Sequence, residues 1–202
     1  VEQERHVPGE VAARHLGAAA WVGREGQHAR FLWPSMFSRV AEELDRRHGL
    51  RYEHLAAIAR KNFANARHNP YAQTRRWTFT ERSFADDEVA NPVIDGRIRK
   101  QDCGQITDGA AVVFLASEAV ARDYAARRGL RLHDLARLRG WGHRTAPITY
   151  AAKVAASRDQ PYVFPWVRAT IEDAFRRAGL PGVEAVDGIE THDCFTTSEY
   201  MA

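Results

Sequence analysis

The sequence predicts an α/β protein that carries a mostly helical region ahead of its alternating part. The run GAAVVFLAS, Gly109–Ser117, is continuously apolar and rich in β-branched residues, which is typical of a strand covered on both faces. After this run, stretches with apolar residues at helical spacing alternate with stretches whose composition is typical of strands. Strands that alternate with helices in this way are typical of α/β folds.

Three helices are predicted before residue 70. The first, Gly9–Gly23, is alanine-rich and ends at a glycine. The second begins at Pro34 and stops at Gly49, with apolar residues on one face. The third runs from Tyr52 to His68 and ends before an Asn-Pro pair, where the residue before proline disfavours helix. We expect the second and third helices to form a helical hairpin.

Residues 70–101 lose this periodicity and predict an irregular segment of polar residues and isolated aromatics. Irregular segments of that length are usually functional or belong to a subdomain. After the strand expected at Gly109–Ser117, a helix is predicted at Glu118–Arg128. Ser117 can accept a hydrogen bond at its start, and Gly129 ends it.

The last third of the chain predicts two more strands and one more helix. Ala136–Thr145 has the texture of a strand, in which Gly140 and Gly142 let another backbone approach closely. Trp166–Ala178 is predicted to be an amphipathic helix. Val183–Asp193 is predicted to be a short strand that leads into the sequence THDCFTTSEY.

Composition limits the classes of function. The 202 residues are 45% apolar, too many for a disordered chain, and no stretch approaches the length of a membrane span. Two cysteines and no secretory signal predict reduced thiols and a cytoplasmic location. The basic, aromatic stretch Lys61–Trp77 is followed at once by acidic residues, so solvated helix faces explain it better than nucleic acid. The histidines and cysteines lack metal-ligand spacing, and no metal is expected.

The segment with the strongest candidates for catalytic residues contains His192, Asp193 and Cys194. On a strand His192 and Cys194 share one face and Asp193 points the other way. Side chains two apart stand parallel, so an intimate base–thiol pair is hard to form, and a packed thiol is the better interpretation of Cys194. A nucleophilic Cys194 is the less favoured alternative. His192, at a strand end before a polar turn, is a candidate hydrogen-bond donor to developing charge.

Two motifs together resemble the thiolase superfamily. QITDGAAVVFLAS resembles the family's strand that closes the N-terminal half, and VDGIETHDCF resembles the turn that carries an oxyanion-hole residue. The H-D-C-F form is similar to that of sterol-carrier-protein-type thiolases and bacterial acetyl-CoA acetyltransferases. The resemblance implies a thiolase-like layered α/β/α fold, incomplete here, with a helical loop-domain insertion. The resemblance implies three parts of the chain. Residues 1–100 are the end of the N-terminal half together with the loop domain. Residues 101–129 are the returning strand and helix of that half, and residues 130–202 are the start of the C-terminal half.

The resemblance also implies roles for particular residues. His192 matches the oxyanion-hole position, and Met36 lies near the place where the family's loop domain contacts coenzyme A. The family's nucleophilic cysteine and its later catalytic histidine and cysteine have no counterpart here, so we expect this chain to be inactive alone. The expected substrate is an acyl-CoA thioester, with no separate cofactor. A homo-oligomer and an accessory protein are the expected partners.

Two other functions stay open. A thiolase-like aldolase of steroid side-chain degradation shares this architecture, lacks the nucleophilic cysteine and works with a partner protein. A non-catalytic subunit that binds coenzyme A or lipid would also suit a chain without the nucleophile. The residue at the missing nucleophile position and the affinity for coenzyme A would separate these functions.

Overall fold

The computed structural model describes residues 6–21 and 23–202 in two units. The larger unit comprises the described residues up to 108 together with residues 146–165 and 189–202. The smaller unit comprises residues 109–145 and 166–188. We describe each unit by itself.

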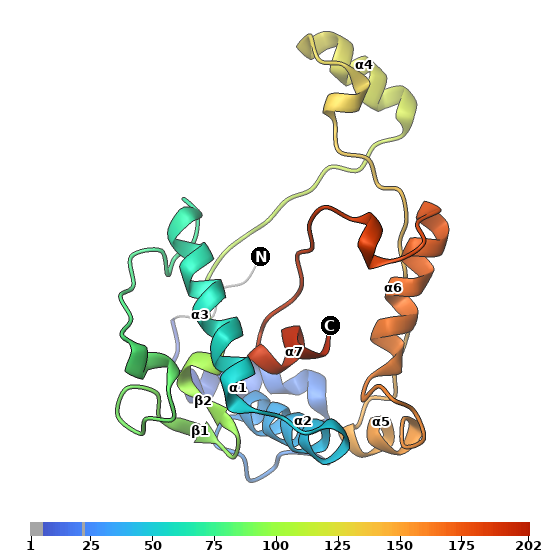
Figure 1. Cartoon of the computed structure of the whole chain (residues 1–202). Coiled ribbons are helices and arrows are strands. Elements are labelled where there is room, and N and C mark those ends of the chain that lie inside the picture. The colour runs from blue at the N-terminus through green and yellow to red at the C-terminus, as the bar shows by residue number, and fades with distance from the viewer. Residues whose placement is uncertain (1–5, 22) are drawn as a thin grey trace. The chain divides into compact units, whose positions relative to one another are not determined.

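The larger unit is built mainly from helices (Figure 1). Its α-helices are α1 (Gly9–Gly17), α2 (Leu32–His48), α3 (Tyr52–His68), α5 (Tyr150–Ala156) and α7 (Thr196–Met201). Its short 3₁₀-helices are η1 (Ala18–Ala20), η2 (Glu81–Phe84) and η3 (Lys100–Asp102). The strands β1 (Val93–Asp95) and β2 (Ile98–Arg99) form an antiparallel pair.

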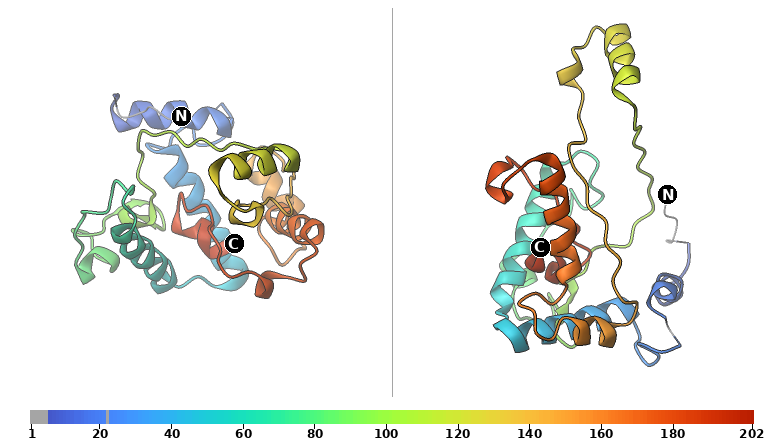
Figure 2. Two further views of the ribbon diagram at one scale, coloured as in Figure 1. Left: turned by 90° about the horizontal axis from the view of Figure 1, so that it is seen from above. Right: turned by 90° about the vertical axis from the view of Figure 1, so that its right-hand side faces the viewer.

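The three helices predicted before residue 70 are present, but two details were wrong. The first is shorter than Gly9–Gly23, since α1 ends at Gly17 and the 3₁₀-helix η1 follows it. Helices α2 and α3 do not form the predicted hairpin, because α3 turns steeply away from α2 (Figures 1 and 2). The apolar face of α3 packs instead against α7 and η2, where Ala59 and Phe84 are buried in one aromatic cluster.

The segment 70–101 is irregular over most of its length, as predicted, but it also contains η2 and the strand pair β1–β2, which the sequence did not predict. Hydrogen bonds to side chains hold much of it. Asn91 is fully buried, and its amide donates to the hydroxyl of Tyr52 at 2.6 Å and to the carbonyl of Ala85 at 3.0 Å. Its side-chain oxygen accepts from the backbone of Gln101 at 3.0 Å. These side-chain hydrogen bonds take the place of the backbone hydrogen bonds that an irregular segment lacks. They therefore fix the segment where η3 begins.

A buried ion cluster joins α2 to the segment after α5. Glu43 accepts hydrogen bonds from Arg46 at 2.6 Å and from Arg47 at 2.6 Å, and the side chain of Arg47 is only 7% exposed. Arg47 also donates to the carbonyl oxygen of Ser157 at 2.8 Å and to its hydroxyl at 3.1 Å. Because Ser157 is fully buried, this guanidinium satisfies polar groups that have left water.

The smaller unit contains α4 (Glu118–Arg128), η4 (Leu132–Asp134), α6 (Pro165–Ala178, whose first residue falls in the larger unit) and η5 (Val183–Ala185). The predicted end signals of α4 are confirmed. Ser117 accepts from the backbone of Val120, and Gly129 is left-handed, with a φ of 66°. The close approach predicted for Gly140 and Gly142 is confirmed as well, because both glycines lie against the backbone of α6.

Gly142→Ala tests that packing. A Cβ there would collide with the carbonyl oxygen of Thr170, a backbone atom that cannot turn aside. We expect the substitution to lower the free energy of unfolding by about 1–3 kcal/mol, as overpacking does. Chemical denaturation would measure this, with Gly109→Ala as the control, since a Cβ at Gly109 meets nothing within 4 Å. Equal stabilities for the two variants would contradict the close approach.

The three strands predicted at Gly109–Ser117, Ala136–Thr145 and Val183–Asp193 are not strands in the structure, and those predictions were wrong. The apolar run is open to solvent: Val112, Val113, Phe114 and Leu115 are between 76% and 92% exposed. A strand exists only where a neighbouring strand accepts and donates its hydrogen bonds. Within the described residues, no strand pairs with the apolar run, and residues 183–185 form a 3₁₀ turn instead.

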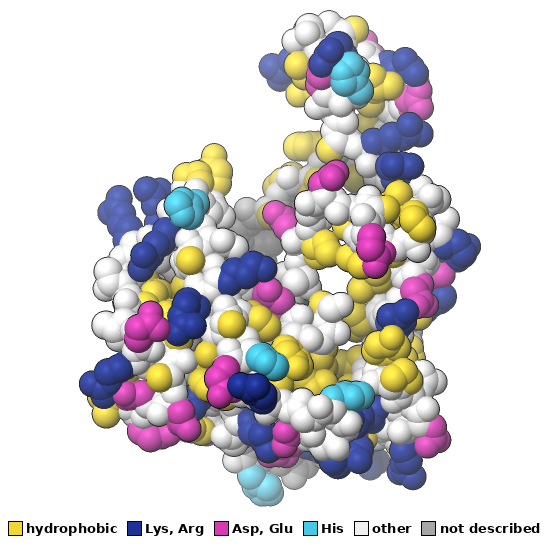
Figure 3. All heavy atoms as spheres, viewed as in Figure 1, with side chains coloured by type: hydrophobic (Ala, Val, Ile, Leu, Met, Phe, Trp, Pro, Cys, Tyr) yellow, Lys and Arg dark blue, Asp and Glu magenta, His cyan; other side chains and the backbone are white. Residues whose placement is uncertain are grey.

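The fold class is confirmed as mixed α/β, with much more helix than strand. On the face in Figure 3, arginine and lysine side chains alternate with acidic ones rather than gathering in one patch. None of the helices that the structure describes combines the length and apolarity needed to cross a membrane.

Candidate functional site

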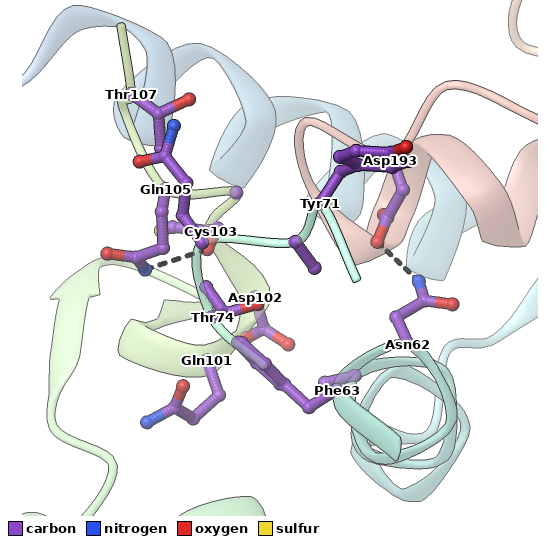
Figure 4. Close-up of a pocket in the computed structure, with 14 residues that line it drawn as sticks. Asn62, Phe63, Tyr71, Thr74, Gln101, Asp102, Cys103, Gln105, Thr107 and Asp193 are labelled. Carbon is purple, nitrogen blue, oxygen red and sulfur yellow. Dashed lines mark hydrogen bonds between the residues drawn. The ribbon is translucent and has the colours of Figure 1, made fainter. Parts of the chain in front are cut away.

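A cavity of about 350 Å³ lies in the larger unit, beside α3 (Figure 4). Three parts of the chain line most of it: α3, the turn that follows α3, and the segment from η3 to Thr107. Its lining includes Ala59, Asn62, Phe63, Tyr71, Ala72, Gln73, Thr74, Gln101, Asp102, Cys103, Gly104, Gln105, Thr107 and Asp193. Asp193 brings the T-H-D-C-F segment to this wall.

Backbone pairing fixes the T-H-D-C-F segment beside the cavity. Cys103 and Phe195 form an isolated antiparallel bridge, and the amide of Gly104 donates to the carbonyl of Cys194 at 2.7 Å. The ring of Phe195 stacks on that of Phe37 of α2, with centroids 4.3 Å apart. A Cβ on Gly104 would lie 3.1 Å from the carbonyl oxygen of Cys194, so glycine allows this approach.

Asp102 connects the cavity wall to the start of α7. It is 1% exposed, and its carboxylate accepts from the backbone of Arg99 at 2.8 Å and from the hydroxyl of Thr196 at 2.9 Å. Burial raises the pKa of Asp102, although these two hydrogen bonds act in the opposite direction. Asp102 therefore ties η3 to the first turn of α7.

Asn62 lies on the wall of the cavity that α3 forms, and it joins two acidic side chains there. Its side-chain nitrogen donates to Asp193 at 2.6 Å and to Glu199 of α7 at 2.7 Å, and Figure 4 shows Asp193 directed toward it. Burial is the largest influence on Asp193 and raises its pKa; the negative charge of Glu199 adds to this, while Asn62 and His192 lower it. One amide group thus holds two carboxylates close together.

Cys103 lies in the cavity wall as a protonated thiol. Burial, together with the negative charge of Asp102, raises the pKa of Cys103 to about 12, and its thiol donates to the carbonyl of Arg99 at 3.5 Å. The thiolate is the nucleophilic form of cysteine. Cys103 is therefore unsuited to be a nucleophile near neutral pH.

We expect alkylation to reveal this. A rise from the ordinary value of 9.0 to about 12 leaves about a thousandfold less thiolate at neutral pH. In Cys194→Ser, iodoacetamide should therefore label native Cys103 about a thousandfold more slowly than the urea-unfolded chain, as followed by peptide mass spectrometry. Equal rates in native and unfolded protein would contradict the raised pKa.

The structure separates the residues that the sequence singled out. His192 is exposed and is not part of the cavity lining. Cys194 is half-buried, with its sulfur 3.6 Å from the hydroxyl oxygen of Ser198. Met36 is 8% exposed and packs with Ala20 and Leu32 in a small core. The oxyanion-hole role of His192 and the coenzyme A contact of Met36 stay predictions.

Sequence reasoning missed the residues that converge on the cavity, above all Asn62, Gln101 and Asp102. One signal was available for Asn62. It follows Leu55 and Ala59 at helical spacing on the face of α3 that packs inward, and a polar side chain there needs a partner. No such signal marks Gln101 or Asp102, which lie in an irregular segment.

Comparisons with known proteins show related sequences. Human sterol carrier protein 2 is 27% identical over 180 residues, which cover 89% of this chain and 30% of that protein. Acetyl-CoA acetyltransferase of Methanothermobacter thermautotrophicus is 28% identical over 191 residues, covering 90% of this chain and 42% of that protein. Benzoylsuccinyl-CoA thiolase subunit BbsB of Thauera aromatica is 29% identical over 154 residues, covering 76% of this chain and 35% of that subunit. No protein-family model matches the sequence.

The chain spans less than half the length of each of these relatives. Two of the three relatives carry thiolase or acetyl-CoA acetyltransferase names, and the similarity to them extends along most of this chain. A mixed α/β chain fits a thiolase-like fold. These relatives confirm that the chain resembles the thiolase superfamily, as its two motifs indicated.

Proposed function

We propose that this chain is part of a thiolase-type acyltransferase that acts on acyl-CoA thioesters by thiolysis or Claisen condensation. The observation that carries the proposal is its similarity to an acetyl-CoA acetyltransferase along 90% of the chain. The H-D-C-F motif adds support, because backbone pairing with residues 103–104 holds it in place.

In this proposal His192 donates a hydrogen bond to the thioester oxygen as negative charge develops there. Its exposed side chain is available to a substrate. Neither cysteine of the chain takes the acyl group, since Cys103 is held protonated and Cys194 lies against Ser198. The nucleophile would come from outside these residues, and the chain alone would be inactive.

The proposal extends to location and partners. We place the protein in the cytoplasm, as a homo-oligomer in its whole form, with an accessory protein as a further partner. The helical region that contains Met36 would cover the coenzyme A moiety. Because Met36 is 8% exposed, it would support that surface from beneath rather than present a broad contact.

A non-catalytic role is the second candidate. The name sterol carrier protein 2 among the relatives favours it, since a carrier of lipid or coenzyme A needs no nucleophile. The thiolase-like aldolase stays a third hypothesis, distinguished by the residue at the nucleophile position.

Thiolysis of acetoacetyl-CoA tests the proposal. The intact protein that contains this chain should consume acetoacetyl-CoA in the presence of free coenzyme A and form acetyl-CoA, as measured by absorbance and chromatography. The 202-residue chain serves as the control and should show no turnover. Calorimetric titration with coenzyme A separates the two candidate functions. Tight binding of coenzyme A by an intact protein that shows no thiolysis would favour the carrier role over the acyltransferase.

A further inference from the structure

The position of His192 is set from its C-terminal side. Among the described residues, no hydrogen bond holds residues 187–192, and the last one before them joins the amide of Val186 to the carbonyl of Val183. After His192, the side chain of Asp193 is bonded to Asn62, and backbone bonds hold Cys194. Asp193 is therefore the anchored residue nearest to the histidine, and it is its direct neighbour.

Asn62 carries that anchor. Its side-chain nitrogen donates to Asp193 Oδ2 at 2.6 Å, whereas Asp193 Oδ1 has no partner among the residues that the structure describes. A half-buried carboxyl group that lost its donor would gain by turning toward water. Such a turn would move the peptide unit that joins Asp193 to His192.

The donor is held in place at both of its hydrogens. The same nitrogen of Asn62 donates to Glu199 Oε2 at 2.7 Å, and Lys61 Nζ lies 3.9 Å from the other oxygen of Glu199. A rotation of the amide would lose both hydrogen bonds. Asn62 therefore presents its N–H to Asp193 in one orientation, as a residue that supports a functional group should.

The two bonds of Asn62 differ in what else could replace them. Helix α7, which contains Glu199, has a second tie, because the hydroxyl of Thr196 donates to buried Asp102 at 2.9 Å. The carboxyl group of Asp193 has no second tie within the described part of the chain. Loss of Asn62 should therefore disturb the segment at Asp193 more than it disturbs α7.

We propose that Asn62 is the positioning residue for His192, because it holds the carboxyl group of the next residue, Asp193. The inference rests on the proposed function, in which His192 donates to the thioester oxygen as charge develops. Asn62 does not contact the reacting atoms in this role. It acts through the placement of His192, and a displaced donor stabilises the developing charge poorly, because hydrogen bonds weaken steeply as their geometry degrades.

Thiolysis by the intact protein tests the catalytic part. Asn62→Ala should lower kcat about tenfold, the population ratio that one hydrogen bond controls. Asn65→Ala is the matched control, because Asn65 lies on the same helix but is exposed and outside the cavity lining. It should keep the wild-type kcat. Equal kcat values for Asn62→Ala and the wild type would overturn the proposal.

A double-mutant cycle with His192→Ala separates positioning from a general loss of structure. If Asn62 acts through His192, the double variant should be no slower than His192→Ala alone, because no imidazole remains to be placed. A loss of structure would lower the activity of His192→Ala as much as that of the wild type. A further tenfold loss in the double variant would therefore overturn the proposal.

Variants at the two acceptors identify the bond that matters. Asp193→Ala should lose about as much kcat as Asn62→Ala, and Asp193→Asn should restore most of that loss, since it keeps an oxygen that accepts from Asn62. Glu199→Ala should lose much less, because Thr196 still holds α7. Equal losses in Asp193→Ala and Asp193→Asn, or an equal loss in Glu199→Ala, would contradict the proposal. This comparison also applies if Asn62→Ala does not fold.

A readout without activity keeps this inference distinct from the proposed function. In the 202-residue chain, the ring signal of His192 in a proton–carbon NMR spectrum is assigned by its loss in His192→Ala. It should shift in Asn62→Ala and stay in place in Asn65→Ala. An unchanged signal in Asn62→Ala would overturn the positioning role whatever the activity. A shifted signal with no thiolysis by the intact wild type would support the positioning role and contradict the proposed function instead.

Discussion

Glu43→Ala is expected to lower the free energy of unfolding by about 3–5 kcal/mol, the cost of leaving a buried charge without its partner. Arg47 would keep a guanidinium whose side chain is 7% exposed, and its carboxylate partner 2.6 Å away would be gone. The cluster also fixes residues 157–162 through the hydrogen bonds of Arg47. Urea denaturation followed by tryptophan fluorescence would measure the loss.

Glu42→Ala is the matched control, because Glu42 precedes Glu43 on the same helix and is exposed. Exposed positions of this kind usually change stability by less than about 0.5 kcal/mol. If the two variants lost the same free energy, the buried cluster would not be a source of stability.

The same cluster gives the stability an acid dependence. Hydrogen bonding from Arg46, followed by that from Arg47 and their positive charges, lowers the pKa of Glu43 from 4.5 to about 2 against the opposing effect of burial. Because the folded pKa is below the unfolded one, the contribution is complete above about pH 4.5 and is lost as pH falls through about 2. Glu43→Gln should remove this component of acid unfolding.

For the proposed thiolysis by the intact protein, with His192 as the proposed oxyanion-hole donor, His192→Ala is expected to reduce kcat about 10²–10³-fold, the usual effect of removing one such donor. The KM for acetoacetyl-CoA should change little, because the hydrogen bond strengthens only as charge develops on the thioester oxygen. Cys194→Ala, two residues away, should leave kcat within a few-fold of the wild type. The opposite pattern, with Cys194 essential and His192 dispensable, would contradict both assignments.

Helices could be predicted from this sequence because their signals are local. Ser117 and Gly129 mark the two ends of α4 in the sequence and do so in the structure. The strands failed for the converse reason. A run such as AAVVFL favours an extended backbone, but the run itself does not indicate whether a neighbouring strand will pair with it, and among the described residues none does. The apolar face of α3 likewise predicted burial without saying that α7 would cover it.

The candidate site was predictable only in part. The sequence drew attention to His192, Asp193 and Cys194 as neighbours, and the alternation of a strand placed Asp193 on its own side. It could not indicate that Asn62, 131 positions earlier, would hold Asp193. Contacts over such separations arise from packing, which periodicity along the chain does not record.

The exposed apolar run at residues 112–115 favours aggregation of the chain. Burying a Val, Leu or Phe side chain releases about 1.5–3 kcal/mol, so withdrawing Val112, Val113, Phe114 and Leu115 from water could release about 6–12 kcal/mol. Exposed β-branched runs of this kind are templates for cross-β assembly. The chain therefore stays in solution only if residues 112–115 are covered before two molecules meet and associate. Because molecules meet more often at higher concentration, we expect aggregation to increase as the protein is concentrated.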